Sequence, residues 1–379
     1  MMYETHGILF GVIALVCSVL LAYAITPIVR VLAFKIKAVD IPKDNRRMHK
    51  RPIPLIGGLA IFLSFFITCL FFCDYSKSLF LLLGGGLLIV IVGIFDDIYS
   101  INPWLKFACQ IAIAAITVCG GIRIDQINLG GTYISLGIWS IPLTVLWITG
   151  LTNAINIIDG LDGLSCGVST ISLISILLVI ITQGGDFNSA LITLILIGSC
   201  CGFLPSNKNP AKIFMGDTGA LFLGYTLSVI SIEGMFKLHT VISLIVPLII
   251  FALPLADTLF AIIRRLLAGK SPFAADRGHF HHKLIDMGFT QKGAVKILYS
   301  ICALLGLVAV FMCESMFAYN SIFKSLSIAV IAIIIFIMYV FILKNPESRV
   351  HTGLLDNANE PLPGAATSEK DISEDTDKQ

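Results

Sequence analysis

Charged residues are scarce in this chain of 379 residues: only 13% are Asp, Glu, Lys or Arg, whereas 56% are hydrophobic. Soluble domains contain about 25% charged and roughly 45 to 50% apolar residues. Together with a mean hydropathy of +0.91, this deficit excludes a soluble enzyme. The formal net charge is only +2, so the chain also lacks the positive field with which proteins recruit nucleic acid.

The cysteines lack the spacing of a metal or redox site. None of the ten forms a C-x-x-C pair or has a histidine at ligand spacing, as zinc and redox centres require. Most of them lie inside apolar runs. We therefore interpret them as small residues of a membrane core rather than as disulfides or zinc ligands.

Long apolar runs recur along the chain. About 20 helical residues cross a hydrocarbon core of about 30 Å, and these runs are too long and continuous for barrel strands. The sequence therefore predicts an all-α polytopic membrane protein with about eleven transmembrane helices. The predicted spans are 7–34, 54–73, 79–95, 104–121, 140–157, 163–182, 189–205, 213–233, 241–263, 294–317 and 321–344.

The distribution of Lys and Arg predicts the orientation of these spans. With the amino terminus outside, the inner loops carry 15 Lys and Arg residues and the outer connections carry 3, and such residues accumulate on the cytoplasmic side. An odd number of spans then places the carboxyl terminus in the cytoplasm. We expect a transmembrane catalytic domain at residues 1–344, followed by an acidic, disordered cytoplasmic tail at 345–379.

Two connections have a character of their own. Residues 121–137 place apolar residues on both sides of Gly130-Gly131, which favours an external β-hairpin with a glycine turn, the alternative being an irregular loop. The inner connection 264–292 is the longest polar one and is rich in His and Arg. Connections of that length in a compact protein are usually functional or disordered.

The conspicuous polar residues lie where spans meet the predicted cytoplasmic loops. Placing an ionised Asp at the centre of a bilayer costs a few kcal/mol on insertion scales, so such residues need a reason. Four connections carry them, all on one side, whereas solvated loops would explain a set scattered over both sides. The set consists of Asp96, Asp97, Asn153, Asn156, Asp159, Asp162, Asp217, Asp276, Arg277, His279, His281 and His282.

The carboxylates in this set suit cation binding and proton transfer. Adjacent Asp96 and Asp97 can attract a divalent cation or accept a proton, although a solvated helix cap is the alternative. Asn156, Asp159 and Asp162 recur at every third residue. On a helix and the turn after it, they share one face and offer hard oxygen ligands that suit Mg²⁺.

The remaining polar motifs suit phosphate binding. Asp217 follows Gly216 at a predicted helix start, where it is either an N-cap or a ligand to a phosphate-bound cation. The histidine run 279–282 suits a zinc site, a basic loop or a diphosphate clamp, of which the clamp fits best. One chemistry accounts for all these groups: Mg²⁺-assisted phosphoryl transfer between a cytosolic nucleotide and a membrane lipid.

Five motifs resemble the polyprenyl-phosphate N-acetylhexosamine-1-phosphate transferases, in order, over about residues 40 to 290. They are RRMHKRPIPLIGGLAIF at 46–62, GIFDD at 93–97, NAINIIDGLDGL at 153–164, FMGDTG at 214–219 and SPFAADRGHFHHKLIDMGFT at 271–290. The HKRPIPLIGG segment and the histidine run interrupted by Phe280 are similar to the branch that begins teichoic acid, O-antigen and enterobacterial common antigen synthesis (the WecA/TagO type). They are less similar to the branch that transfers phospho-MurNAc-pentapeptide.

The resemblance implies a glycosyltransferase of the bacterial inner membrane, with its active site on the cytoplasmic face. The expected reaction converts UDP-N-acetylglucosamine and undecaprenyl phosphate into undecaprenyl-diphospho-N-acetylglucosamine and UMP, with Mg²⁺ or Mn²⁺ as cofactor. It would begin the synthesis of a cell-envelope polysaccharide such as teichoic acid or lipopolysaccharide O-antigen. Another UDP-N-acetylhexosamine or a phospho-MurNAc-pentapeptide donor is the alternative, followed by a polytopic transporter. No nucleic-acid partner is expected, and a homodimer is left open.

The resemblance also implies roles for individual residues. Asp217 and Asn156 would contact the Mg²⁺ and the diphosphate. Asp96 and Asp97 would handle the lipid phosphate, and Asp159 with Asp162 would shape the nucleotide and metal site, which makes these four the expected catalytic residues. The expected substrate-binding residues are Lys43, His49, Asn153, Asn156, Arg277, His279, His281 and His282.

Overall fold

The computed structural model of this chain describes residues 2–41, 52–129, 132–236, 245–274, 276 and 278–317. The chain divides into two units, residues 1–331 and residues 332–379. The second unit lies outside the described residues, as do the predicted span 321–344, the predicted tail, and Lys43, His49 and Arg277. The expectations for these parts stay predictions.

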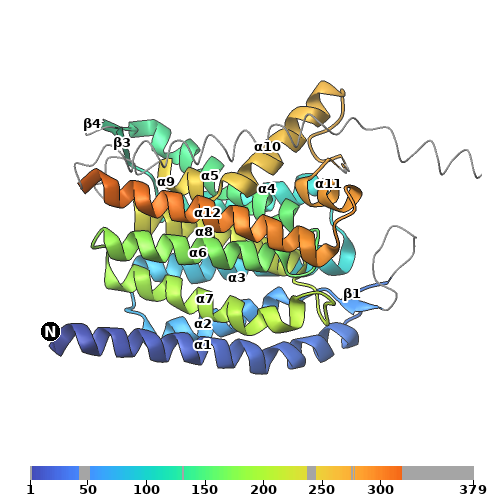
Figure 1. The fold of residues 1–379 in the computed structure, drawn as a ribbon, viewed down its shortest axis with the longest axis horizontal. Coiled ribbons are helices and arrows are strands. Elements are labelled where there is room, and N and C mark those ends of the chain that lie inside the picture. Colours follow the sequence, from blue (N-terminus) through green and yellow to red (C-terminus); the bar gives the residue numbers. More distant parts are fainter. Residues whose placement is uncertain are drawn as a thin grey trace, which may run out of the picture. The chain divides into compact units, whose positions relative to one another are not determined.

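Helices dominate the first unit, and two short antiparallel sheets accompany them (Figure 1). The α-helices of the described part are α1 (Met2–Lys35), α2 (Gly58–Phe72), α3 (Lys77–Tyr99), α4 (Pro103–Cys119), α5 (Ser140–Ile158), α6 (Leu164–Thr182), α7 (Phe187–Asn207), α8 (Gly216–Ser231), α9 (Ile245–Ile250), α10 (Ala252–Leu267), α11 (Phe280–Asp286) and α12 (Gln291–Phe317). The strands are β1 (Val39–Asp40), β2 (Ile53–Pro54), β3 (Gln126–Leu129) and β4 (Thr132–Ser135), and single turns of 3-10 and π-helix occupy Gly137–Trp139 and Ile232–Phe236.

Several helices have the length and composition of membrane spans. In the described part of the chain, six segments qualify: Gly7–Lys35, Lys77–Tyr99, Gly137–Ile158, Leu164–Thr182, Phe187–Asn207 and Gln291–Cys313. Helices α2 and α4 are apolar but shorter. Large apolar side chains on α1 such as Ile28 and Val31 are exposed, as expected for a surface that meets lipid. The helical membrane class is therefore supported, while the count of eleven spans and their orientation stay predictions.

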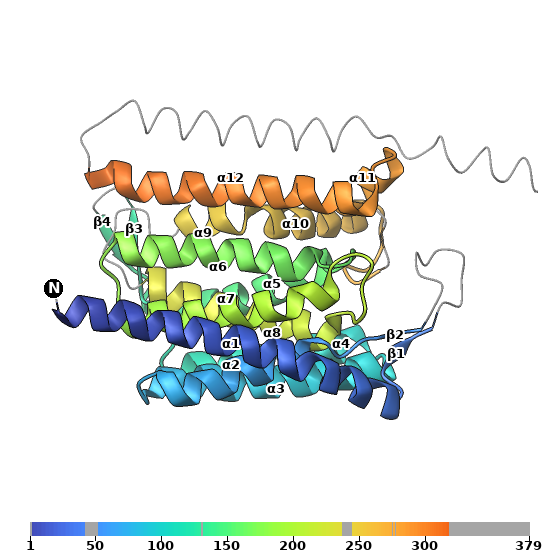
Figure 2. The same ribbon diagram turned by 60° about the horizontal axis from the view of Figure 1, so that its bottom comes forward.

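Helix α8 lies among the other helices and positions the site (Figure 2). It packs against α2, α3 and α5, and every residue from Thr218 to Ser231 is buried. Two glycines permit this close approach, because a Cβ atom on Gly93 would overlap the backbone of Thr218 and one on Gly58 would overlap Gly219. The last turns of α3 therefore lie directly against the first turn of α8.

The predicted span 241–263 is not one continuous helix over its described part. Helix α9 ends at Ile250, and α10 begins at Ala252 after a turn at Phe251. Pro254 explains this interruption, because proline has no N–H to donate to the carbonyl group of Ile250 and its ring clashes with that carbonyl. Helix α10 then continues to Leu267, beyond the predicted boundary.

The two small sheets join segments that are close in the sequence, and the first of them also contacts the distant segment before α8. Val39 of β1 pairs with Pro54 of β2, and the carbonyl oxygen of Pro54 accepts the N–H of Phe214 at 2.8 Å. This second bond fixes the entry to α8. Strands β3 and β4 pair antiparallel, with Ile127 opposite Ile134, which confirms the predicted strand pairing. The predicted glycine turn at 130–131 lies outside the described residues, and the external location stays a prediction.

Candidate active site

A cleft of about 1640 Å³ opens where α3 and α5 end and where α4 and α8 begin. Of the residues singled out from the sequence, eight line it: Asp96, Asp97, Asn153, Asn156, Asp159, Asp162, Asp217 and His282. The fold thus brings together side chains from connections that are far apart in the sequence. All the predicted catalytic residues and both predicted metal ligands border the same cavity.

Asp97 holds the amino-terminal end of α8. Its Oδ1 atom accepts the N–H of Asp217 at 2.9 Å, and its Oδ2 atom accepts the N–H and the hydroxyl group of Thr218 at 3.0 and 2.6 Å. Both oxygens therefore satisfy groups that the first turn of a helix leaves unpaired. This carboxylate fixes where Asp217 stands in the cleft.

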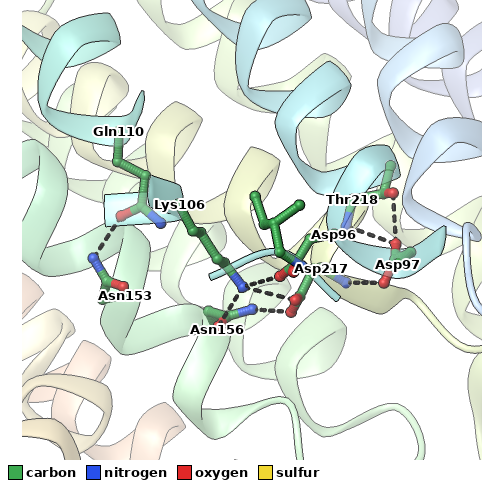
Figure 3. Close-up of polar contacts among 9 residues, drawn as sticks. Asp96, Asp97, Lys106, Gln110, Asn153, Asn156, Asp217 and Thr218 are labelled. Carbon is green, nitrogen blue, oxygen red and sulfur yellow. Dashed lines mark hydrogen bonds and ion pairs between the residues drawn. The ribbon is translucent and has the colours of Figure 1, made fainter. Parts of the chain in front are cut away.

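Lys106 of α4 is the centre of the polar cluster (Figure 3). Its Nζ atom lies 2.7 Å from Asp96 Oδ2 and 2.7 Å from Asp217 Oδ2, and 3.4 Å from Asn156 Oδ1. The amide group of Asn156 donates to Asp217 Oδ1 at 2.5 Å. Four helices thus contribute one residue each to a network around a single ammonium group.

The oxygen atoms around Lys106 have the chemistry of a Mg²⁺ site. Mg²⁺ prefers hard oxygen ligands, and two carboxylates and one amide oxygen already face the same positive charge. In the described part of the chain, no three His, Cys, Asp or Glu side chains are grouped as a metal site. Two carboxylates alone do not make such a group. The donor set fits Mg²⁺ when the amide oxygen of Asn156 is the third ligand and the ammonium group of Lys106 moves away from these oxygens.

Asp159 and Asp162 lie beyond the end of α5 and differ in their surroundings. Partial burial, followed by the negative charges of Asp217 and Asp97, raises the pKa of Asp159 well above its ordinary value. Asp162 instead accepts the side-chain N–H of Asn209 at 2.9 Å and a backbone N–H at 3.0 Å. It therefore holds the connection between α7 and α8 against the cleft.

The three histidines are placed differently from one another. His282 lines the cleft, whereas His279 and His281 are buried behind it, with their rings parallel and 5.7 Å apart. His281 packs directly on Gly160. Burial, followed by the charge of His282, lowers the pKa of His281 to about 3, so its ring is neutral at physiological pH.

His279 is bound to Asp257 of α10, with 3.1 Å between His279 Nδ1 and Asp257 Oδ2. Asp276 accepts hydrogen bonds from Arg264 at 2.6 Å and from the N–H of Gly278 at 2.8 Å. Burial alone would raise the pKa of Asp276, but these two bonds lower it. The predicted diphosphate clamp therefore has one described histidine, His282, on the cleft wall.

Comparison with known proteins identifies the family. Residues 79–235 match the model of glycosyl transferase family 4. The chain is 39% identical over 354 residues to a probable undecaprenyl-phosphate N-acetylglucosaminyl 1-phosphate transferase of Bacillus subtilis, covering 93% of this chain and 94% of that protein. The chain belongs to glycosyl transferase family 4. This finding confirms the family that the sequence motifs resemble.

Two further relatives of this family 4 member come from other bacterial groups. An undecaprenyl-phosphate alpha-N-acetylglucosaminyl 1-phosphate transferase of Haemophilus influenzae is 32% identical over 295 residues, covering 74% of this chain and 82% of the relative. A decaprenyl-phosphate N-acetylglucosaminephosphotransferase of Mycobacterium tuberculosis is 32% identical over 331 residues, covering 78% and 81%. The family match includes Lys106, Asn156 and Asp217 and ends before the histidine run.

Sequence reasoning missed Lys106 of this family 4 site and two polar residues that support it. Lys106 lies inside the predicted apolar span 104–121, yet an ionisable residue in such a span is itself a signal of function. Gln110 follows one turn later and accepts the side-chain N–H of Asn153 at 2.6 Å. Asp257 lies inside a predicted span too, and its partners follow more than 20 residues later, so no local pattern identifies it.

Proposed function

We propose that this family 4 member transfers N-acetylglucosamine 1-phosphate from UDP-N-acetylglucosamine to undecaprenyl phosphate, releasing UMP. The single observation that carries the proposal is the cluster of Asp96, Lys106, Asn156 and Asp217 on the wall of one cleft. Such a cluster of fixed charges is what phosphoryl transfer requires, because positioning and charge stabilisation supply most of its catalysis. The names of the relatives supply the donor and the acceptor.

The reaction forms one bond and breaks one. An oxygen of the lipid phosphate attacks the sugar-linked phosphorus, and the bond from that phosphorus to the oxygen bridging to UMP breaks. A phosphate monoester has a second pKa of about 6, so the lipid phosphate is largely dianionic at neutral pH. It therefore needs charge neutralisation more than it needs a general base.

The residues of the cleft divide this work between them. Lys106 neutralises phosphate oxygens, and Asp97 keeps the first turn of α8 in place through Asp217 and Thr218. Asp96, Asp217 and the amide oxygen of Asn156 would hold Mg²⁺, which supplies positive charge beside the diphosphate when bound. Dependence on Mg²⁺ or Mn²⁺ is part of the proposal.

The lining of the cleft suits the binding of a nucleotide and a lipid side by side. Its polar end includes Asn209 and Lys212, whereas Leu146, Phe107 and Ile262 give it an apolar wall. A nucleotide-sugar is water-soluble and a polyprenyl phosphate stays in the bilayer, so both kinds of surface are needed. We place this cleft at the cytoplasmic face of a bacterial inner membrane, in agreement with the predicted excess of Lys and Arg on that side.

The proposal is tested by UMP release in detergent. Purified chain receives UDP-N-acetylglucosamine, UDP-N-acetylgalactosamine or UDP-MurNAc-pentapeptide separately, with undecaprenyl phosphate held constant. We expect turnover of UDP-N-acetylglucosamine, and mass spectrometry should show the lipid diphosphate sugar. Preference for the pentapeptide donor would overturn the assigned donor and leave the chemistry intact, whereas no UMP from any donor would refute the reaction. Size analysis of the same preparation checks for a homodimer.

A further inference from the structure

Asp257 is a buried carboxylate inside helix α10 that the transfer chemistry above does not use. Only 2% of it is exposed, and a buried carboxylate is costly unless it is hydrogen-bonded. Its two oxygens have separate partners: Oδ1 accepts the N–H of Phe280 at 3.1 Å, and Oδ2 lies 3.1 Å from His279 Nδ1. Both partners belong to the segment that begins α11.

The same helix holds this segment at a second point. Arg264, about two turns after Asp257 along α10, donates to Asp276 at 2.6 Å. The other oxygen of Asp276 accepts the N–H of Gly278 at 2.8 Å. Asp276 and Phe280 are therefore each bonded to α10, and the bond to Asp257 is the one at the start of α11.

Helix α11 carries His282, the histidine that lines the cleft. The bond from Asp257 to the N–H of Phe280 sets where this helix begins, and His282 follows within the same first turn. The bond to Nδ1 orients the ring of His279 and favours the tautomer that carries its proton on that nitrogen. A change at Asp257 thus reaches the cleft through Phe280, because His282 follows two residues later in α11.

We propose that Asp257 is a positioning residue for the transfer reaction, and that it acts by fixing the start of α11 so that His282 stands on the cleft wall. This role rests on the proposed function. Arg264 and Asp276 keep the segment attached when Asp257 is changed, so loss of the carboxylate displaces His282 without unfolding the chain. The effect falls on the nucleotide-sugar, since the predicted partner of His282 is the donor diphosphate.

The test is a double-mutant cycle on the purified full chain, with UMP release as the assay. We expect Asp257→Ala to lower kcat/KM for UDP-N-acetylglucosamine by about 10- to 100-fold, by comparison with the loss found when a partner that orients a metal-bound histidine is removed. Asp257→Asn keeps an oxygen that accepts the N–H of Phe280, so its kcat/KM should fall less than that of Asp257→Ala. The KM for undecaprenyl phosphate should stay within about twofold. In the His282→Ala background, Asp257→Ala should have less than about a twofold further effect, because coupled residues are not additive.

Thr117→Val is the matched control, since Thr117 is buried in α4 and its hydroxyl group bonds Tyr225 at 2.9 Å, away from the cleft lining. It should lower the thermal midpoint in detergent and have no greater effect on the kinetic constants for UDP-N-acetylglucosamine than on those for undecaprenyl phosphate. The role of Asp257 would be overturned if the loss of kcat/KM in the double variant equalled the product of the two single losses. It would also be overturned if Asp257→Ala affected the kinetics of both substrates equally. A wild-type chain that releases no UMP would instead contradict the proposed function.

Discussion

Replacing Lys106 by Met tests whether this ammonium group occupies the position of a metal ion. Its Nζ atom lies 2.7 Å from Asp96 Oδ2 and 2.7 Å from Asp217 Oδ2, so these two oxygens are no more than twice that distance apart. At such a separation, an effective dielectric constant of about 20 gives a repulsion of roughly 3 kcal/mol between two unit charges. In the variant, the two carboxylates repel each other because the positive charge between them is lost, and a bound divalent cation offsets this repulsion.

Two opposite changes are therefore expected in the Lys106→Met variant. The lost charge-assisted contact to phosphate should lower kcat/KM about 10- to 100-fold, which corresponds to about 1.5 to 3 kcal/mol. The Mg²⁺ concentration for half-maximal activity should fall about tenfold, less than the full repulsion implies, because the side chain of Asp217 is 32% exposed and solvent screens its charge.

The assay is UMP release with the UDP-N-acetylglucosamine concentration varied to obtain kcat/KM, and then with the Mg²⁺ concentration varied at saturating substrates. Lys296→Met is the matched control, because Lys296 is exposed on α12 and does not line the cleft. It should leave both quantities unchanged. An unchanged or higher Mg²⁺ requirement in Lys106→Met would refute the idea that the lysine and the metal share one set of oxygens.

Three further predictions address other parts of the structure. Asp217→Asn should abolish turnover while the chain stays folded, and excess EDTA should do the same to the wild type; activity in either experiment contradicts the metal proposal. Gly93→Ala places a Cβ atom against Thr218 and should cost about 1 to 3 kcal/mol of stability, seen as a lower thermal midpoint in detergent together with lost activity. Stability should also fall as the pH is lowered from 6.5 toward 3, because the pKa of His281 is about 3 when folded and 6.5 ordinarily, so the unfolded chain binds the proton first. At pH 5 the loss is about 2 kcal/mol, and His281→Gln should reduce this pH dependence of the thermal midpoint.

The amino-acid sequence alone determined the class of the protein and the family. Apolar runs of about 20 residues specify membrane helices whatever they pack against, because the bilayer acts on each segment separately. Asp96, Asn156 and Asp217 could be recognised because each lies near the end of an apolar run and within a polar motif, in GIFDD, NAINIIDGLDGL and FMGDTG, and neighbouring residues are sufficient for that inference. The glycine pair in 121–137 likewise predicted a hairpin from neighbouring residues only.

Contacts between distant segments decided the rest. In the sequence, Lys106 is a single charged residue in an apolar span. Only the packing of α3, α4, α5 and α8 shows that its ammonium group lies between the carboxylates of Asp96 and Asp217. The three histidines are alike in sequence, yet Asp257 and Gly160 hold two of them behind the cleft and leave His282 at its wall. Such roles depend on which side chains meet across 20 to 120 residues of chain, and that is set by how closely the helices approach at positions such as Gly93.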